Sequence, residues 1–375
     1  MNELTRLPRV PRPSRVSAYV VGRLGPAVID RKTVTDVLDC YGIRTAGPSR
    51  NLRLARRSLN VAVATPAGKR VLKLYRPQWK PATVLYGHSI LLELERQNVP
   101  SVRLAQTREG MTYVTREDRV FAVFDFIPGV NYSLNYLRRP DRLRLTVIAA
   151  ETLASFHRSV RGFMPSGEHH LGFVSPAGAR HRDVTWHAVK LDDLDRRSAR
   201  LVDADASARA TALRDASTSL LQEIERLDAR LAAAELPRLV IHGDYGLHNL
   251  IFQSTSAIPV DFEVSRMDWR INDLVSALGK YRYRSGQYDF ESMYTFMRSY
   301  VRHFPLTSDE QRLLPEIWRL YKLQAAVQYW NSYFETDGPI RKLDSALDSI
   351  EQAQWVSEHA DVMERLAYAG EREDS

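Results

Sequence analysis

Hydrophobic and polar residues alternate in the first third of the chain, a pattern that predicts β-strands. A strand-like tract at 50–55 comes first, and Val61 and Val63 then alternate with alanines. The apolar run 71–75 follows after a Pro-Ala-Gly-Lys turn. A second pair of apolar runs, 111–114 and 120–126, is separated by a polar Arg-Glu-Asp turn. Two such runs joined by a short turn are typical of a hairpin, so the pattern predicts a small antiparallel sheet.

The rest of the chain is dominated by the spacing typical of helices, with apolar residues every three or four positions in segments such as 141–160. The pattern therefore predicts an α+β fold, with a small lobe built on the antiparallel sheet and a larger, mostly helical lobe. We place an Arg/Pro-rich arm at 1–30, the small lobe at 31–126 and the helical lobe at 127–375. Helices are expected at 33–40, 82–97, 141–160 and 206–231 and from 273 onwards, with a short strand at 239–242.

Composition excludes several classes of protein. Of the 375 residues, 44% are hydrophobic and 26% are charged, which is ordinary for a globular protein and unlike a disordered one. The single cysteine, Cys40, has no partner for an internal disulfide. No apolar run reaches the roughly 18–20 residues that span a bilayer, and 1–25 lacks the apolar core of a secretory signal. We therefore expect a cytoplasmic protein without a membrane partner.

Charge is distributed unevenly along the chain. Lysine and arginine exceed aspartate and glutamate by 53 − 45 = +8, yet residues 261–375 carry 14 basic and 20 acidic side chains, a net of −6. Residues 1–260 therefore carry a net +14. Their basic side chains are not gathered with aromatic residues in a nucleic-acid-binding module, so we expect a solvated basic surface and no nucleic-acid partner. The acidic balance of 261–375 favours a cationic or amino-bearing ligand.

The most informative stretch is 240–263. Two apolar segments within it each deliver polar groups at one end: Asp244 and Asn249 follow the first, and Asp261 follows the second. Carboxylates beside apolar strands are costly to bury unless a cation or hydrogen bonds compensate them. Mg²⁺ takes carboxylate and amide oxygens together with phosphates, so these three residues predict a magnesium–nucleotide site. A structural network of the same residues without a metal is the alternative.

The motif His-Gly-Asp-Tyr-x-x-x-Asn at 242–249, with Asp-Phe-Glu at 261–263, resembles the aminoglycoside phosphotransferase and choline-kinase-like family, small-molecule relatives of the protein kinases. The resemblance implies a bilobal protein-kinase-like fold and transfer of the γ-phosphate of ATP or GTP to a hydroxyl of a small-molecule acceptor, such as an amino alcohol, a sugar or an aminoglycoside. It implies that Asp244 is the catalytic base and that Asn249 and Asp261 hold Mg²⁺.

Further positions take supporting roles by the same resemblance. His242 opens the catalytic loop, Glu263 ends the Asp-Phe-Glu segment, and Asp273 would brace the loop from a following helix. Within the family the chain is most similar to the bacterial stress response kinases and the type II homoserine kinases. Lys-Leu-Tyr-Arg-Pro at 73–77 resembles a run of the stress response kinases.

The upstream half supplies the nucleotide-binding residues that the resemblance implies. Lys73 lies among apolar neighbours in a chain with only eight lysines, and it takes the place of the family's strand lysine, which contacts the α- and β-phosphates. Ser58 and Asn60 fall in the region of the nucleotide-covering loop, which lacks the glycine pattern of protein kinases. The hinge whose backbone would meet the base matches Asp125, Phe126 and Ile127.

One position departs from the family pattern. The helix that follows Lys73 lacks the early glutamate that pairs with this lysine in the family, because the region reads Tyr86-Gly87-His88. Either Glu93 takes over or Lys73 is unpaired. An unpaired lysine would weaken catalysis, which leaves a nucleotide-binding pseudokinase scaffold as an alternative function. A Ser/Thr protein kinase of the stress response type is a further alternative.

Overall fold

The computed structural model describes residues 29–47, 49–51, 59–335 and 338–370. The chain forms two compact units, each assembled from separate stretches of sequence. Residues 127–160 belong with the sheet in unit 1, and the lobe boundary expected at residue 127 stays a prediction. Unit 1 comprises Met1–Val160, Met164–His169 and Leu247–Val264, and unit 2 comprises Arg161–Phe163, His170–Gly246 and Ser265–Ser375.

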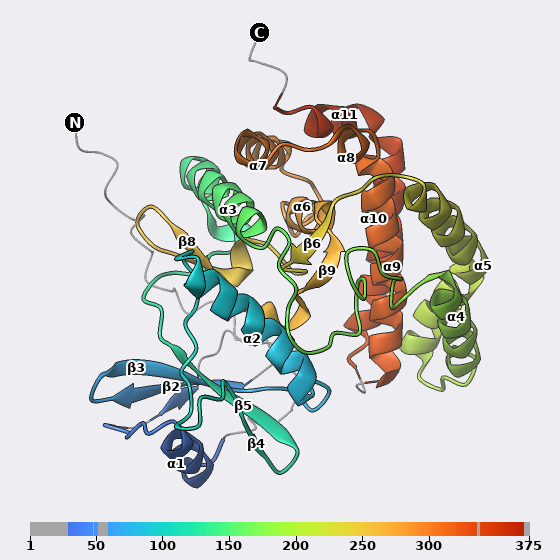
Figure 1. Cartoon of the computed structure of the whole chain (residues 1–375). Coiled ribbons are helices and arrows are strands. Elements are labelled where there is room, and N and C mark those ends of the chain that lie inside the picture. The colour runs from blue at the N-terminus through green and yellow to red at the C-terminus, as the bar shows by residue number, and fades with distance from the viewer. Residues whose placement is uncertain (1–28, 48, 52–58, 336–337, 371–375) are drawn as a thin grey trace. The chain divides into compact units, whose positions relative to one another are not determined.

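Unit 1 contains the predicted antiparallel sheet, with five strands in the order β1-β2-β3-β5-β4 (Figure 1). The second hairpin begins later than the sequence predicts, because Thr107 and Met111 close a turn through two hydrogen bonds and keep 111–113 out of the sheet. The expected strand at 50–55 is described only at its start, and its remainder lies outside the described residues. The strands are β1 (Arg50–Asn51), β2 (Leu59–Thr65), β3 (Gly68–Leu74), β4 (Val114–Arg116) and β5 (Arg119–Asp125).

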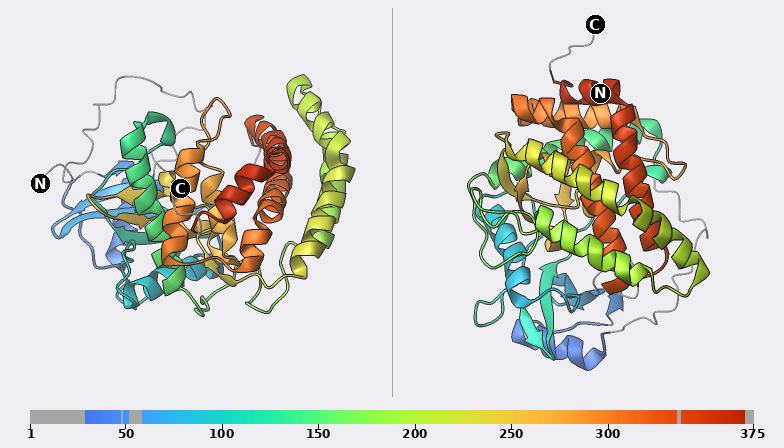
Figure 2. Two further views of the ribbon diagram at one scale, coloured as in Figure 1. Left: turned by 90° about the horizontal axis from the view of Figure 1, so that it is seen from above. Right: turned by 90° about the vertical axis from the view of Figure 1, so that its right-hand side faces the viewer.

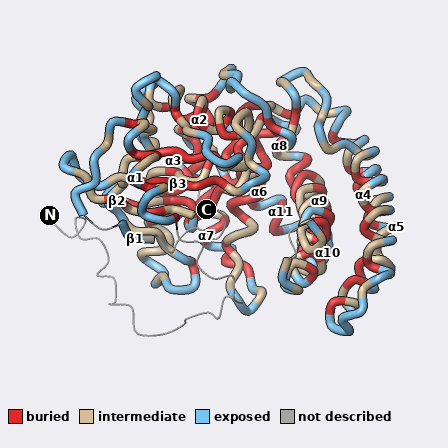
Figure 3. Tube along the Cα trace, turned by 90° about the horizontal axis from the view of Figure 1, so that it is seen from below, coloured by how far each residue is buried: buried red, intermediate tan, exposed pale blue. Residues whose placement is uncertain are grey.

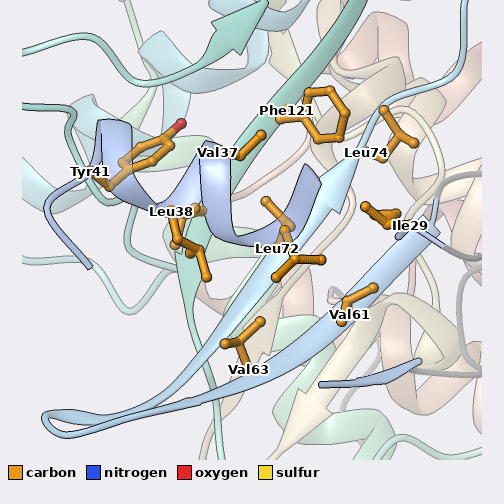
Figure 4. Packing of buried hydrophobic residues seen from close by; sticks show 11 residues of the cluster. Ile29, Val37, Leu38, Tyr41, Val61, Val63, Leu72, Leu74 and Phe121 are labelled. Atoms are coloured by element: carbon orange, nitrogen blue, oxygen red, sulfur yellow. The ribbon is translucent and has the colours of Figure 1, made fainter. Parts of the chain in front are cut away.

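One face of the sheet is covered by helix α1 (Arg31–Cys40). Figure 4 shows Val37 and Leu38 of this helix turned toward Leu72 of β3, with Val61 and Val63 of β2 on the same side. These side chains are almost completely buried. Burial of each contributes roughly 1.5–3 kcal/mol of hydrophobic free energy. Because side chains alternate along a strand, Lys73 lies on the opposite face of the sheet from Leu72.

Helix α2 (Pro81–Arg96) lies against this second face. Its His88 contacts the ring of Phe124 edge-on at 5.9 Å, and Phe124 lies opposite Val71 in the β3–β5 pair, on the face that carries Lys73. Unit 1 also contains a second small hairpin and the long helix that packs on it. These elements are α3 (Arg139–Ser159), the 3₁₀ helices η1 (Leu134–Tyr136), η2 (Leu247–Asn249) and η3 (Phe262–Val264), and the strands β7 (Leu250–Phe252) and β8 (Ala257–Pro259).

Unit 2 is mostly helical, with one two-stranded sheet formed by β6 (Arg238–Ile241) and β9 (Arg266–Trp269). Helices α9 and α10 form an antiparallel pair, and α4 and α5 pack beside them (Figure 2). Figure 3 shows α4 and α5 alternating buried and exposed residues, whereas every residue of α6 is buried. The helices are α4 (Val184–Ser198), α5 (Ala204–Ala232), α6 (Ile271–Leu278), α7 (Phe290–His303), α8 (Ser308–Arg312), α9 (Leu314–Glu335), α10 (Arg341–Glu358) and α11 (Ala360–Ala367).

The described helices were also compared with what a membrane span requires. None of them combines the length and the apolar character needed to cross a bilayer.

Candidate active site

Lys73 is buried and lies at the centre of an ion-pair cluster in unit 1. Its Nζ is 2.7 Å from Oε1 of Glu263 and 3.1 Å from Oδ1 of Asp261, and it lies 5.0 Å from the centre of the Tyr75 ring. Burial alone would lower the pKa of Lys73, but the two carboxylates outweigh burial and raise this pKa above its ordinary value. The lysine therefore stays charged. Lys73, Asp261 and Glu263 are called the Lys73 cluster below.

A short hairpin brings Asn249 near Asp261. Strands β7 and β8 pair antiparallel, with Leu250 opposite Pro259, so the residues that flank this pair meet at one end of the hairpin. There the backbone N–H of Val260 donates to the Asn249 carbonyl oxygen at 3.0 Å. Asp261 follows directly, with φ of +69°, a left-handed conformation that Asp tolerates better than most residues. Both predicted metal-binding side chains are thus carried by one end of one hairpin.

Helix α2 explains how Glu263 reaches Lys73. Gly87 approaches the Asp-Phe-Glu segment so closely that a Cβ atom at this position would lie 3.1 Å from the Phe262 carbonyl oxygen. Because glycine has no side chain, α2 and η3 can pack directly against each other. This close packing holds η3 where Glu263 meets the lysine. Glu263 therefore pairs with Lys73 in place of the glutamate that α2 lacks.

The structure corrects the expectation for the partner of this lysine. Lys73 is not unpaired, because Glu263 and Asp261 both bind it. Glu93 is not its partner either: the Glu93 carboxylate accepts hydrogen bonds from the Arg96 guanidinium at 2.8 Å and from the Gln97 amide at 2.5 Å. The sequence identified the missing helix glutamate but did not show which residue replaces it.

His88, next to Gly87, forms a hydrogen bond with Tyr75, whose ring lies beside Lys73. Its Nε2 lies 2.9 Å from the Tyr75 hydroxyl, and its Nδ1 lies 2.9 Å from Oγ1 of Thr112. Burial, together with the nearby Lys73 charge, lowers the pKa of His88 to about 3, so the imidazole is neutral at neutral pH. A cavity of about 40 Å³ borders Lys73, Gly87 and His88, which is room for one or two waters.

The nucleotide-covering positions are only partly described. Asn60 on β2 lies opposite Lys73 in the β2–β3 pair, so the two side chains share a face of the sheet. The Asn60 Oδ1 is buried, and among the described residues it has no hydrogen-bond partner. An orphaned buried oxygen of this kind is uncommon in proteins and marks a position where a ligand donor or water can bind. Ser58 lies outside the described residues.

The hinge segment leaves the sheet at the end of β5. Asp125, the last residue of this strand, forms an ion pair with Arg70. The backbone N–H of Phe126 donates to the Lys69 carbonyl oxygen at 3.4 Å, and the Lys69 ammonium lies 5.4 Å from the centre of the Phe126 ring. Ile127 follows and is half-buried. The three predicted hinge residues thus continue directly from the strand next to β3.

Asn131 is a residue that the sequence did not indicate. Its Nδ2 donates to the carbonyl oxygens of His248 at 2.6 Å and Leu250 at 3.0 Å, while Val130 forms two backbone hydrogen bonds with Phe252. The segment after the hinge is therefore tied to the backbone around η2, which carries Asn249. No motif marks this asparagine, because its partners are more than 110 residues away in the sequence.

Asp244 belongs to unit 2, where a buried aspartate holds the loop that leads to it. Asp273 on α6 accepts the backbone N–H of His242 at 2.6 Å and that of Gly243 at 2.8 Å, one on each carboxylate oxygen. Gly243 has φ of +81°, a conformation that glycine adopts without steric strain. His242 is fully buried, and its Nδ1 accepts the backbone N–H of Asp244 at 3.4 Å. The loop is thus held by hydrogen bonds to the side chains of Asp273 and His242.

A lysine that the sequence did not indicate binds Asp244, and a second lysine lies near the first. Lys280, just after α6, donates to Oδ1 of Asp244 at 2.5 Å and to the Tyr245 carbonyl oxygen at 2.9 Å. Burial lowers the pKa of Lys322 on α9, and the nearby positive charge of Lys280 lowers it further. The scarcity of lysine, which drew attention to Lys73, was a signal for both residues as well.

A buried strand lysine paired with the Asp-Phe-Glu carboxylates, and an aspartate on a braced His-Gly-Asp loop, define a kinase-like phosphotransferase. The chain belongs to the phosphotransferase enzyme family (APH), whose profile matches residues 52–300. The predicted family and the predicted α+β fold class are confirmed, with a small antiparallel sheet and a mostly helical remainder. The protein is an enzyme that transfers phosphate to a hydroxyl group of a small molecule.

Individual relatives agree with this assignment. The homoserine kinase of Caulobacter vibrioides is 25% identical over 265 residues, which cover 69% of this chain and 74% of that protein. The microcompartment-associated aminopropanol kinase has a TM-score of 0.60 at 16% identity and covers 92% of this chain and 99% of its own. Amicoumacin kinase hAmiN in complex with AMP-PNP, Ca²⁺ and Ami has a TM-score of 0.59 at 14% identity, covering 90% and 93%. The two structural likenesses show the fold alone.

Proposed function

We propose that the chain transfers the γ-phosphate of ATP, bound with Mg²⁺, to the hydroxyl group of a small acceptor that also carries an amino group. The observation that carries the proposal is the Lys73 cluster, in which a buried strand lysine pairs with both carboxylates of the Asp-Phe-Glu segment. Homoserine and aminopropanol, named for two of the relatives, are acceptors of this type. The nucleotide analogue and divalent cation of the amicoumacin kinase complex support the donor.

The charge of the Lys73 cluster suits a nucleotide that arrives with a divalent cation. One lysine faces two carboxylates, which leaves a net charge of −1 and would repel a polyphosphate. A divalent cation on Asp261 would change this net charge to +1. Lys73 would then contact the α- and β-phosphates, while Glu263 keeps the lysine in place. The buried Asn60 Oδ1, on the same face of the sheet, offers a hydrogen-bond acceptor to the nucleotide.

The residues present fit a magnesium ion. Asn249 and Asp261 supply an amide and a carboxylate oxygen at one end of the β7–β8 hairpin, and hard oxygen ligands are those that Mg²⁺ prefers. Within the described residues, no three His, Cys, Asp or Glu side chains form a group that could hold a metal. Phosphate oxygens and waters would therefore complete the coordination. When bound, the ion would neutralise charge on the transferred phosphoryl group.

Asp244 would accept the proton of the acceptor hydroxyl. As the hydroxyl oxygen forms its bond to the γ-phosphorus, the bond from this phosphorus to the oxygen that bridges to the β-phosphate breaks. The electron pair of the broken bond leaves with ADP, and the hydroxyl proton passes to the Asp244 carboxylate and then to solvent. Asp273 holds the loop through two backbone hydrogen bonds, so the carboxylate is positioned before the acceptor binds.

The test is acceptor-stimulated ADP release, measured with ATP and with GTP over a panel of amino alcohols, hydroxy amino acids, sugars, aminoglycosides and a Ser-containing protein. We expect release with small amino-bearing acceptors, and a fall of about 10³-fold in Asp244→Asn with nucleotide affinity retained. Asp361→Asn is the control, because Asp361 forms an exposed surface pair with Arg365. Wild-type turnover in Asp244→Asn would contradict the role of this residue.

The same assay decides between transfer and the two alternatives. The scaffold alternative rested on an unpaired Lys73, and the contact with Glu263 removes that reason. Tight nucleotide binding without ADP release for any acceptor would nevertheless favour a scaffold. Release with the protein acceptor alone would favour a protein kinase over a small-molecule kinase.

A further inference from the structure

Two ion pairs and one further lysine lie together in unit 2, and Asp244 belongs to one of the pairs. Lys280 binds Asp244, and Arg282 binds Asp348 of α10 at 2.7 Å. Lys322 of α9 is a third cation beside these two pairs, and all five residues belong to unit 2. They are called the Asp244 cluster below. Three cations against two carboxylates leave a net charge of +1, a surplus that an anionic ligand would neutralise.

Among the described residues, Lys322 is the cation of this cluster that has no carboxylate in ion-pair contact. Its Nζ lies against the turn after α6, 2.9 Å from the place where a Cβ atom on Gly279 would be. In the described part of the chain, no carboxylate lies within ion-pair distance of this ammonium, and its contact is with the ring of Tyr321 at 5.9 Å from the ring centre. A half-buried lysine wedged against Gly279, beside a second lysine, is an expensive arrangement for a merely structural residue.

The electrostatics of Lys322 agree with this geometry. Burial and the neighbouring Lys280 and Arg282 lower the pKa of Lys322 to about 8, while Asp348 only partly offsets them. An anion bound at Lys322 would relieve the repulsion between these cations and stabilise the charged lysine. The link to Asp244 runs through Lys280, which directly follows the Gly279 that Lys322 contacts and which donates to the Asp244 carboxylate. An anion held by Lys322 and Lys280 would therefore lie beside the lysine that contacts the proposed catalytic base.

We propose that Lys322, with Lys280 beside it, binds an anionic group of the acceptor, so that the acceptor is a hydroxy acid and not a simple amino alcohol. The inference rests on the proposed function and names the acceptor class for that same site. It separates the two kinds of relative, because homoserine carries a carboxylate and aminopropanol does not. It also runs against the acidic total of residues 261–375, which favours a cationic ligand.

The test compares acceptors that differ only by the anionic group. Calorimetric titration would be done with L-homoserine against 3-aminopropan-1-ol, L-threonine against 1-aminopropan-2-ol, and glycerol 3-phosphate against glycerol. We expect at least one acid to bind about 10-fold or more tightly than its partner, since a hydrogen bond to a charged group is worth that much. The third pair separates a phosphate from a carboxylate as the recognised group. Binding decides this inference even if no acceptor is phosphorylated, so its failure is distinguishable from failure of the proposed function.

Variants then assign the preference to the lysine. Lys322→Met should lower the affinity for the acid by about 10-fold and leave the amino alcohol within about twofold, whereas Lys322→Arg should keep the preference. Lys322→Gln replaces Lys322→Met if the latter does not fold. Lys190→Met on α4 is the control, because Lys190 is 3.8 Å from Glu335 and outside the Asp244 cluster.

Three results would overturn the inference. The first is equal binding of each acid and its partner by the wild-type protein. The second is a preference that survives unchanged in Lys322→Met. The third is a Lys322→Met variant whose affinity for ATP falls while its affinity for the acid does not, since the lysine would then serve the transferred phosphoryl group.

Discussion

The two charged clusters of this protein have opposite balances. The Lys73 cluster joins one cation to two carboxylates, and the Asp244 cluster joins three cations to two carboxylates. The first therefore lacks positive charge and the second lacks negative charge. A phosphotransferase needs both, because a divalent cation must accompany the nucleotide and an acceptor must be held beside the base. This difference is the basis on which we propose a different ligand for each cluster.

The comparison also shows that the charge of a long segment says little about the charge at a site. Residues 261–375 carry a net −6, yet the same segment supplies all three cations of the Asp244 cluster. Acidic residues of the segment pair elsewhere with cations from outside it, such as Asp344 with Arg209 and Glu316 with Arg230. Screened surface pairs contribute little to recognition, whereas half-buried groups at a site dominate it.

Removal of the central cation should have the largest effect on the Lys73 cluster. Lys73→Met leaves Asp261 and Glu263 without their cation, and we expect kcat/KM for ATP to fall about 100-fold because the phosphates lose a direct contact. Steady-state ADP production at varied ATP measures this. Lys80→Met is the matched control, since Lys80 is exposed at the start of α2. An unchanged ATP dependence in Lys73→Met would contradict the assignment.

The neutral His88 beside Tyr75 should make the stability of the folded chain sensitive to acid. The pKa of His88 is about 3 in the folded chain against about 6.5 when unfolded, so its contribution to stability is present above pH 6.5 and is lost as pH falls toward 3. Between pH 6.5 and 5 the free energy of unfolding should fall by up to about 2 kcal/mol from this residue. Urea titrations of wild type and His88→Gln measure the difference, and equal acid sensitivity in the two proteins would refute the prediction.

The carboxylate that replaces the helix glutamate should have a smaller effect. Glu263→Gln keeps the shape of the side chain and removes its charge, so Lys73 is held less firmly, and we expect KM for ATP to rise about 10-fold. Glu93→Gln is the matched control, because Glu93 binds Arg96 and Gln97 and not the lysine. If Glu93→Gln raised KM for ATP as much as Glu263→Gln, the pairing described here would be wrong.

The smallest expected effect is a pH dependence of acceptor binding. With a pKa of about 8, Lys322 loses its charge as pH rises, so KM for a hydroxy acid should rise about fourfold between pH 7 and 8.5. The groups that face Lys322 are Lys280, Arg282, Asp348 and the Tyr321 ring. Lys322→Arg should remove the dependence, since arginine stays charged. 4-Hydroxybutanoate, which has no amine to titrate, is the suitable probe.

Local sequence predicted much of the fold. The alternation at 61–63 and the run at 71–75 appear as β2 and β3, and helical spacing gave α3 and α5 to within two residues at each end. Helix α4 was missed, because polar and charged residues dilute its apolar stripe; its buried residues are His187, Leu191, Leu194 and Ser198. Strand β9 was missed as well, since an ion pair of Arg266 with Asp268 hides its strand character.

Some residues of the candidate site were likewise visible in the sequence, and others were not. Asp244, Asn249 and Asp261 follow short apolar segments and were visible in the sequence, but their roles stay proposals. The pairing of Lys73 with Glu263 was not visible, because it depends on the close approach of α2 at Gly87. Lys280 also escaped notice, since it reaches Asp244 from a turn 36 residues further on. Contacts between distant segments are set by packing, and no local pattern records them.

The account is tested most directly by two Michaelis constants measured in two variants. KM for ATP and KM for the preferred acid acceptor would be determined in Lys73→Met and in Lys322→Met under identical conditions. The two clusters predict a reciprocal result, in which Lys73→Met raises KM for ATP alone and Lys322→Met raises KM for the acceptor alone. If both variants raised KM for the same substrate, the opposite roles assigned to the two clusters would be contradicted.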